Sequence, residues 1–148
     1  MKLAQVGSSI HGTLLAPNDV DIAIQTDSKK EFKQLCKLYN SEPVHIKGKS
    51  LATSKQGSFN YIILHNITIS EYVKGMDFNI VRGYKNLQSG RLVLFKEAKQ
   101  ALKTKTIKML HRDKIHSELF AVYGSTDSER LGKYLQKLPT GWTLTVSK

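Results

Sequence analysis

The pattern of hydrophobic and polar positions predicts short strands separated by amphipathic helices. The first apolar run ends at Gly7-Ser8, which is typical of a buried strand that enters a turn. A later segment alternates strictly, so that one face of a strand is apolar and the other carries Asp19 and Asp21. Strands are predicted over residues 3–6, 19–25, 44–46, 60–64, 67–72, 76–81, 92–95 and 142–146.

Helical periodicity predicts the elements between these strands. Asp27 or Ser28 caps one helix, and Glu31 is placed for a capping box with Ser28. Apolar positions after Glu31 recur at helical spacing, so this helix is expected to pack one face on the sheet. Residues 47–58 are polar and contain glycines, which indicates a mobile loop. Further helices are predicted over residues 9–15, 96–119 and 128–138, with a break at Tyr123-Gly124-Ser125.

Length and composition narrow the class of protein. The 148 residues fit one domain, or a compact core with a short appendage. The sequence has no apolar stretch of membrane-spanning length and no apolar core of a secretory signal, so we expect neither a membrane protein nor a secreted one. The single cysteine, Cys36, cannot form an internal disulfide, which favours a reducing, cytoplasmic location.

The net charge of +11 indicates a polyanionic partner, either nucleic acid or a nucleoside triphosphate (NTP). The excess is concentrated between residues 82 and 114, where ten basic residues accompany only Glu97 and Asp113. A solvated basic helix face is the alternative to a surface that binds a nucleic-acid backbone. Candidate nucleic-acid contacts on this segment are Lys85, Lys99, Lys103, Lys105, Lys108 and Arg112.

Asp19 and Asp21 are candidate metal ligands, because side chains at i and i+2 of a strand share one face. Paired carboxylates can hold Mg²⁺, or Mn²⁺, against the oxygens of a triphosphate. Gly7, twelve residues before Asp19, begins a turn whose backbone N–H groups suit phosphate oxygens. Asp77 is a candidate third carboxylate, and Arg82 is a candidate triphosphate contact. The alternative for the carboxylates is a solvent-facing position at a strand end or sheet edge.

The segment VGSSIHGTLLAPNDVDIAI resembles the signature of the polymerase β-type nucleotidyltransferases, in which a Gly-Ser turn precedes an Asp-x-Asp strand. Within that superfamily the chain is most similar to the head domain of bacterial-type tRNA CCA-adding enzymes and poly(A) polymerases. Asp77-Phe78 resembles an Asp-Phe step of that branch, and residues 106–119 resemble the helix after its catalytic core. Three departures are Gly75-Met76 in place of paired arginines, no Glu-Asp-x-x-Arg motif, and a chain too short for a tRNA-holding body.

The resemblance implies an α/β (α+β) nucleotidyltransferase fold, with a mixed β-sheet flanked by helices. We expect the nucleotidyltransferase core over residues 1–95 and a short, basic helical extension over residues 96–148 packed on that core. The implied reaction is two-metal transfer of a nucleoside monophosphate from an NTP, such as ATP, to a hydroxyl group. RNA, for example a tRNA-like 3′ end, is the expected acceptor.

The same resemblance assigns roles to the candidate residues. Asp19 and Asp21 would bridge both metal ions, and Asp77 would complete the acceptor-side metal site or contact the ribose. Ser8, with Gly7 and Ser9, would hold the β- and γ-phosphates. Most of the catalytic power would come from positioning and from neutralising charge.

Two other functions fit the sequence. In one alternative, the chain is a catalytically inactive protein that keeps the fold and binds nucleic acid through residues 82–114. In the other it is a protein-modifying nucleotidyltransferase of the toxin–antitoxin type, which transfers the nucleotide to a protein.

Overall fold

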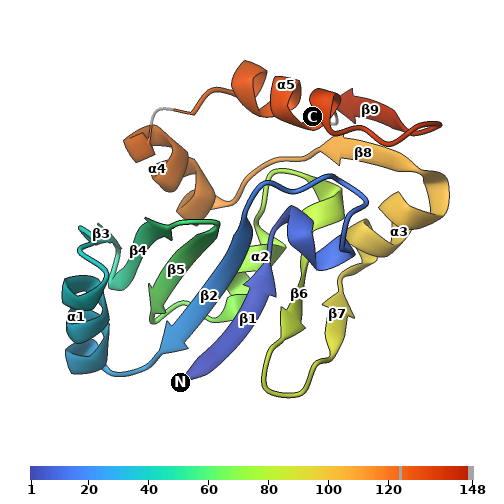
Figure 1. Ribbon diagram of the computed structural model, residues 1–148. Coiled ribbons are helices and arrows are strands. Elements are labelled where there is room, and N and C mark those ends of the chain that lie inside the picture. Colours follow the sequence, from blue (N-terminus) through green and yellow to red (C-terminus); the bar gives the residue numbers. More distant parts are fainter. Residues whose placement is uncertain (124, 147–148) are drawn as a thin grey trace.

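A seven-stranded mixed sheet forms the centre of the computed structural model, which describes residues 1–123 and 125–146 (Figure 1). In spatial order its strands are β3 (Val44–Ile46), β4 (Lys49–Gln56), β5 (Phe59–His65), β2 (Val20–Thr26), β1 (Lys2–Val6), β6 (Gly83–Asn86) and β7 (Leu92–Leu94). β2 and β5 run parallel at its centre, and the other neighbouring strands pair antiparallel. The predicted mixed sheet is therefore confirmed.

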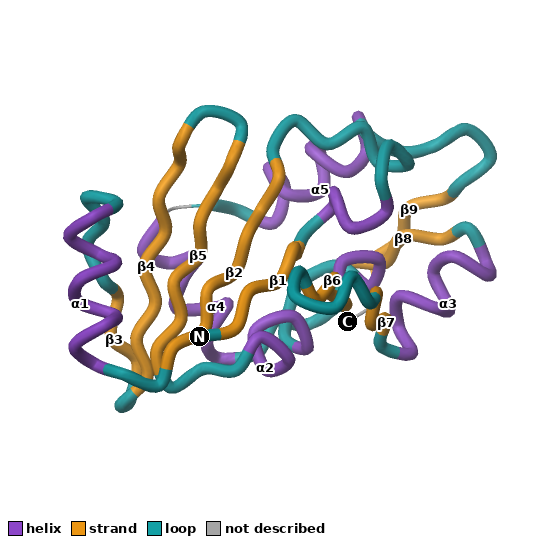
Figure 2. The backbone as a smooth tube through the Cα atoms, turned by 60° about the horizontal axis from the view of Figure 1, so that its bottom comes forward, coloured by secondary structure: helices purple, strands orange, loops and turns teal. Residues whose placement is uncertain are grey.

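Helices and a small second sheet complete the described fold. The α-helices are α1 (Lys29–Leu38), α2 (Ile69–Lys74), α3 (Lys96–Thr104), α4 (Lys114–Tyr123) and α5 (Asp127–Gln136), and the 3₁₀ turns are η1 (Ser8–His11) and η2 (Asn79–Val81). The second sheet pairs β8 (Thr106–Met109) in parallel with β9 (Thr143–Val146). In Figure 1 this sheet and α5 lie above the edge at which β2 begins. Figure 2 shows α1 beside β3 and β4, and α3 beside β7.

The helix α1 forms where its capping residues predict it. Ser28 Oγ accepts a hydrogen bond from the backbone N–H of Glu31 (3.1 Å), which satisfies one of the free donors at the start of the helix. The Glu31 carboxylate accepts a hydrogen bond from the hydroxyl of Thr26, the last residue of β2. In a capping box this carboxylate would instead bind the backbone N–H of Ser28. Phe32 and Cys36 are buried against the sheet, and the predicted amphipathic packing is confirmed.

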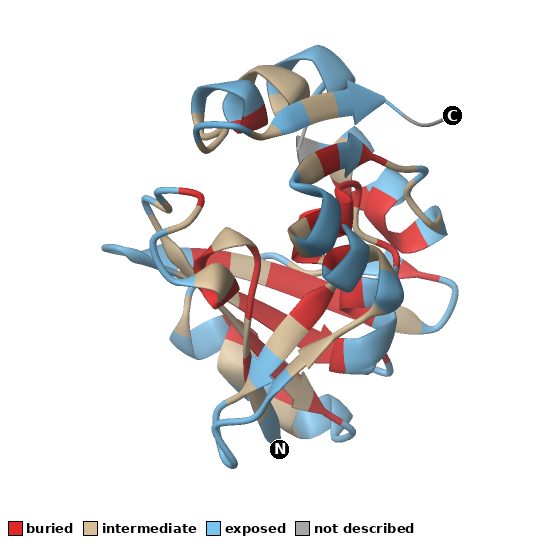
Figure 3. Cartoon of the chain, turned by 90° about the vertical axis from the view of Figure 1, so that its right-hand side faces the viewer, coloured by how far each residue is buried: buried red, intermediate tan, exposed pale blue. Residues whose placement is uncertain are grey.

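The apolar core of the described residues lies on both faces of the large sheet and extends beneath the small one (Figure 3). One cluster joins Phe78 and Ile80 to Ile107 and Tyr134, which belong to β8 and α5. The rings of Phe78 and Tyr134 stack at 4.0 Å between centroids. Residues 96–146 therefore share a hydrophobic core with the segment that follows α2.

The predicted mobile loop over residues 47–58 is wrong, because most of it is the strand β4 in a hairpin with β5. Serine and threonine at its inward positions make the segment look like a loop. In the structure the buried serines of β4 have hydrogen-bond partners: Ser54 Oγ donates to the Tyr39 carbonyl (2.9 Å), and Ser50 Oγ is hydrogen-bonded to His45 Nδ1 (2.7 Å). A buried hydroxyl with a partner is tolerated in a sheet.

The predicted strand over residues 67–72 is also wrong, because α2 occupies most of it. Thr68 Oγ1 accepts a hydrogen bond from the Glu71 N–H (3.0 Å), so a side-chain cap starts a helix within a β-branched run. The predicted strand over residues 76–81 is an extended segment that ends in η2, with a single bridge from Phe78 to Met109.

The long helix predicted over residues 96–119 is three elements. α3 ends at Thr104 and is capped by Lys105, which has a left-handed backbone (φ 51°), and β8 and α4 follow. Other differences are a 3₁₀ turn in place of the helix over 9–15 and the unpredicted strand β6, while Gly124 of the predicted break lies outside the described residues. No helix in the described part of the chain has the length and apolar character needed to cross a membrane.

Candidate active site

A cleft of about 310 Å³ opens where β2 begins, and it contains both predicted carboxylates. Asp19 directly precedes β2 and Asp21 is its second residue. In register, Asp21 lies between Val6 of β1 and Asn60 of β5, so the centre of the sheet fixes its position. The lining includes Ser8, Asp19, Asp21, Asn60, Asp77 and Lys133.

Gly7 brings the phosphate turn against the carboxylate pair. Its backbone has φ 77° and ψ −165°, a conformation that is essentially restricted to glycine. A Cβ atom at this position would lie 2.5 Å from Asp21 Oδ2, so the residue needs glycine for space as well as for conformation. Ser8 lines the cleft, and its contact with a phosphate stays a prediction. Ser9 instead is buried, and its hydroxyl accepts a hydrogen bond from Gln5 Nε2 (2.9 Å), which places it in the support of the turn.

The two carboxylates differ in their electrostatic surroundings. Burial raises the pKa of Asp21; the Asn60 side chain and the charges of Lys133 and Lys137 act against this shift, and Asp19 adds to it. Asp19 is more open, with 35% of its side chain exposed, and forms an ion pair with Lys55 (Asp19 Oδ2 to Lys55 Nζ, 3.4 Å). The pair thus places a desolvated carboxylate beside a solvated one, an arrangement that a divalent cation would stabilise.

Asp77 lines the same cleft but does not join Asp19 and Asp21 as a third carboxylate. Both of its oxygens accept hydrogen bonds from Arg130, at 2.9 Å from Nε and 3.1 Å from Nη2. Arg112 Nε lies 3.9 Å from Asp77 Oδ2. Within the residues that the structure describes, no three His, Cys, Asp or Glu side chains come together in a way that could hold a metal ion. Because Asp77 is only 1% exposed, its charge requires a partner, and the arginines provide it.

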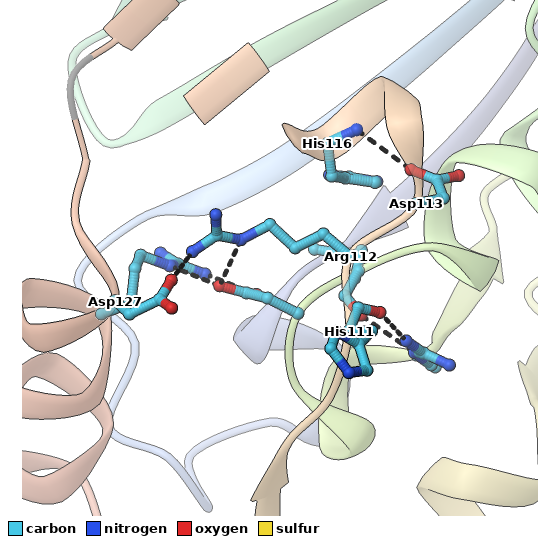
Figure 4. A network of polar contacts seen from close by, with 9 residues as sticks. His111, Arg112, Asp113, His116 and Asp127 are labelled. Carbon is cyan, nitrogen blue, oxygen red and sulfur yellow. Dashed lines mark hydrogen bonds and ion pairs between the residues drawn. The ribbon is translucent and has the colours of Figure 1, made fainter. Parts of the chain in front are cut away.

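Arg112 belongs to this internal network of ion pairs, and its contact with nucleic acid stays a prediction. Its guanidinium pairs with Asp127 at the start of α5 and lies 4.4 Å above the ring of Phe120. Figure 4 shows Arg112 directed toward Asp127, with Asp113 beside His116. Only 18% of the Arg112 side chain is exposed.

Arg82 is not at the carboxylate cleft either, so its predicted nucleotide contact is not supported by its position. Its Nε donates to the Met76 carbonyl (2.9 Å) and its Nη2 to the His111 carbonyl (3.0 Å). These bonds tie the segment after α2 to the segment before α4, and the guanidinium lines a different cavity. The predicted RNA contacts Lys85, Lys99, Lys103, Lys105 and Lys108 are exposed on β6, α3 and β8 and at the α3 terminus.

A cationic face on α5 is a feature that the sequence pattern did not reveal. Arg130, Lys133 and Lys137 line the cleft and are spaced i, i+3 and i+7, so they share one side of the helix. Burial lowers the pKa of Lys133, the nearby charges of Arg130 and Lys137 lower it further, and Asp21 and Asp19 oppose the shift. The spacing was visible in the sequence, but nothing local indicated that this face lies over the carboxylates.

Asn60 and His116 were also missed. Asn60 hydrogen-bonds Asp21 from the neighbouring strand. His116 is 2% exposed, and its Nε2 donates to the Tyr72 carbonyl. Burial lowers its pKa, so the ring is neutral at neutral pH and adds no charge to the cleft.

The residues present fit a Mg²⁺ or Mn²⁺ ion that is shared with a phosphate ligand. Magnesium is commonly held by one or two carboxylates, with the remaining positions taken by water and substrate phosphates. Asp19 and Asp21 supply two carboxylates, while Ser8 and the lysines of α5 supply donors for phosphate oxygens. The cleft can therefore hold a metal–triphosphate group.

Comparison with known proteins establishes the fold. No protein-family model and no curated protein sequence matches the chain. The solved complex of a CCA-adding enzyme with ATP is 18% identical, with a TM-score of 0.56, and the match covers 97% of this chain and 34% of that one. A tRNA-processing enzyme with CTP is 18% identical (TM-score 0.53, 97% and 40% covered), and the apo form I of a tRNA-processing enzyme is 20% identical (TM-score 0.51, 97% and 39% covered).

The chain thus spans about two fifths or less of these enzymes' length. At this level of identity the likeness concerns the fold alone, which the chain shares with these solved structures of CCA-adding and tRNA-processing enzymes. The predicted resemblance and fold class are confirmed.

Proposed function

We propose that this chain is a metal-dependent nucleotidyltransferase that transfers a nucleoside monophosphate from an NTP to a hydroxyl group of RNA. The observation that carries the proposal is a single cleft in which Asp19 and Asp21 lie beside the Gly7-Ser8 turn and opposite the lysines of α5. Solved structures of the same fold support it, since they are of a CCA-adding enzyme with ATP and of tRNA-processing enzymes, one of them with CTP.

Asp19 and Asp21 hold the metal in this proposal. When bound, the ions neutralise the triphosphate and activate the acceptor hydroxyl. Ser8 donates its hydroxyl to a phosphate oxygen, and Lys133 and Lys137 bind the outer phosphates. Asn60 orients the Asp21 carboxylate through its side-chain hydrogen bond. The chain itself contributes mainly by holding these charges in place before the substrate arrives.

Asp77 acts as a positioning residue in this scheme rather than as a metal ligand. Its bidentate bonds to Arg130 connect the segment after α2 to α5. They thereby fix the distance between the α5 lysines and the carboxylates of Asp19 and Asp21. A buried bidentate arginine–carboxylate pair is directional, which suits this task.

The test is incorporation of labelled nucleotide by the purified chain, with Mg²⁺, each of the four NTPs and an RNA oligonucleotide as acceptor. We expect transfer by the wild type, loss of transfer with a chelator, and recovery with added Mg²⁺ or Mn²⁺. The double variant Asp19→Asn/Asp21→Asn should lose transfer while keeping its thermal unfolding midpoint, because it removes two ligands and no apolar contact. Asp27→Asn, at an exposed position just after β2, is the matched control and should retain activity.

Two results would replace the proposal by its alternatives. Wild-type protein that binds RNA but transfers nothing with any NTP would be the inactive nucleic-acid-binding protein. Label that appears on a protein and never on RNA would identify a protein-modifying nucleotidyltransferase.

A further inference from the structure

A second cavity, of about 570 Å³, lies behind one wall of the cleft. The wall consists of α2 and the segment over residues 111–115 that leads into α4, whose residues line one cavity or the other. Arg112 lines the second cavity, and its Nε lies 3.9 Å from Asp77 Oδ2, which lines the cleft. The volume falls within the range of about 300–1,000 Å³ that is usual for ligand sites. At the Arg112–Asp77 contact the two cavities are therefore separated by these two side chains.

The acidic residues of the second cavity already have partners. Lys49 Nζ lies 2.7 Å from Glu71 Oε2, and this bond lowers the pKa of Glu71. Asp113 Oδ1 accepts a hydrogen bond from the His116 N–H (3.0 Å) at the start of α4. The carboxyl group of Asp113 rests on Gly75, where a Cβ atom would lie 2.1 Å away. Both carboxylates thus serve the fold and leave the cavity positive.

Three lysines of this cavity are uncommitted. Lys47 in the turn between β3 and β4, Lys74 at the end of α2 and Lys114 at the start of α4 are all exposed. In the described part of the chain none of the three side chains forms an ion pair or hydrogen bond. They come from three separate elements around a lining that also includes the buried apolar side chains of Ile46 and Ile115. The cavity therefore combines an apolar surface with cations that lack an internal partner.

We propose that this cavity binds the RNA acceptor strand, with Lys47, Lys74 and Lys114 on its phosphate groups and a base or ribose against the apolar lining. The inference rests on the proposed transfer to RNA. Cations spread over three elements suit successive phosphates of a chain, whereas the cleft has its own lysines for a triphosphate. A strand held here lies one wall away from Asp19 and Asp21.

Binding of a 5′-fluorescein-labelled 12-nucleotide RNA, measured by anisotropy in EDTA without NTP, tests this site independently of catalysis. The triple variant Lys47→Gln/Lys74→Gln/Lys114→Gln should bind at least about tenfold more weakly at 0.1 M salt. The slope of log K against log salt should fall by about 2, since each single-strand phosphate contact contributes about 0.7. The control Lys30→Gln/Lys33→Gln/Lys37→Gln removes the same charge from exposed positions of α1 and should bind within about twofold of wild type.

Two outcomes would overturn the site: unchanged RNA affinity in the triple variant, or an equal loss in the α1 control. If the triple variant keeps its RNA affinity but loses the binding of free ATP measured by calorimetry, the cavity is a nucleotide site instead. Thermal unfolding of both variants verifies that they are folded. If wild-type protein transfers nothing but its RNA affinity still depends on these lysines, the proposed function fails and this site stands. If transfer is observed but RNA affinity does not depend on these lysines, the proposed RNA site is wrong and the proposed function stands.

Discussion

Gly7 determines how closely the Gly7-Ser8 turn approaches the carboxylate of Asp21. The sequence suggested its role through spacing, because a Gly-Ser turn precedes Asp19-Val20-Asp21 by twelve residues. The structure adds a steric reason, since a Cβ atom at Gly7 would lie 2.5 Å from Asp21 Oδ2. A side chain at this position must displace the carboxylate or open the turn.

Gly7→Ala should therefore impair catalysis beyond its effect on stability, and Gly12→Ala provides the control. Both glycines have positive φ (77° and 62°), so alanine at either should cost about 1–3 kcal/mol of unfolding free energy. A Cβ atom at Gly12 would meet nothing within 4 Å, whereas one at Gly7 would meet Asp21. We expect kcat/KM to fall more than tenfold in Gly7→Ala alone, assayed well below both melting temperatures. Equal losses in the two variants would show that backbone strain, not the carboxylate, is responsible.

Single residues also show the limit of sequence reasoning. The joint position of Asp19, Asp21 and Ser8 in one cleft was predictable because their neighbours along the chain carry the signal, and their chemical roles stay predictions. Asp77 was assigned to the metal site from local alternation. In the structure both of its carboxylate oxygens accept hydrogen bonds from Arg130, which is 53 residues away. No local pattern indicates which distant partner a buried carboxylate meets.

At the scale of elements, α5 packs on the core and also lines the carboxylate cleft. Thr126 caps the helix by accepting from the Glu129 N–H (3.2 Å), and Tyr134 packs on Phe78. Lys133 and Lys137, in contrast, line the cleft. The sequence predicted this helix from its apolar spacing, and the same spacing places the two lysines together.

Lys133→Gln/Lys137→Gln should weaken NTP binding while leaving the helix intact. A hydrogen bond to a charged group contributes about 1.5–3 kcal/mol, so we expect KM for the NTP to rise at least about tenfold. RNA affinity measured without NTP should change much less. Lys33→Gln/Lys37→Gln has the same i, i+4 spacing on α1 and is the matched control. A KM within about twofold of wild type would remove these lysines from the triphosphate site.

Elements with local signals were predicted correctly. Elements that form only by pairing with residues far along the chain were not. The Ser28 cap predicted α1, and turn chemistry with alternation predicted β2. The helix over 96–119 failed because β8 pairs with β9, some 37 residues further along the chain. β4 failed because its inward serines are paired only once the hairpin with β5 and the end of α1 are in place.

At the scale of the whole molecule, one hydrophobic cluster contains residues from both predicted parts, the core over 1–95 and the extension over 96–148. Leu15, Phe78, Ile80 and Val81 are buried together with Ala101, Ile107, Met109 and Tyr134 from the second part. Burial of each large apolar side chain stabilises the fold by about 1.5–3 kcal/mol, while a small domain has about 5–15 kcal/mol in total. Neither part is therefore expected to be stable alone.

Separate chains of residues 1–95 and 96–148 provide the measurement. Each should show weak near-ultraviolet circular dichroism and no cooperative thermal transition, because each exposes half of the shared cluster. Mixed at equal concentration, they should associate, regain a cooperative transition and recover nucleotidyl transfer. As a control, Ile107→Asp in the second piece should prevent this recovery, since it places a charge at a position that is 0% exposed. A cooperative transition in the 1–95 piece by itself would instead establish it as an independent domain and reduce the second part to an appendage.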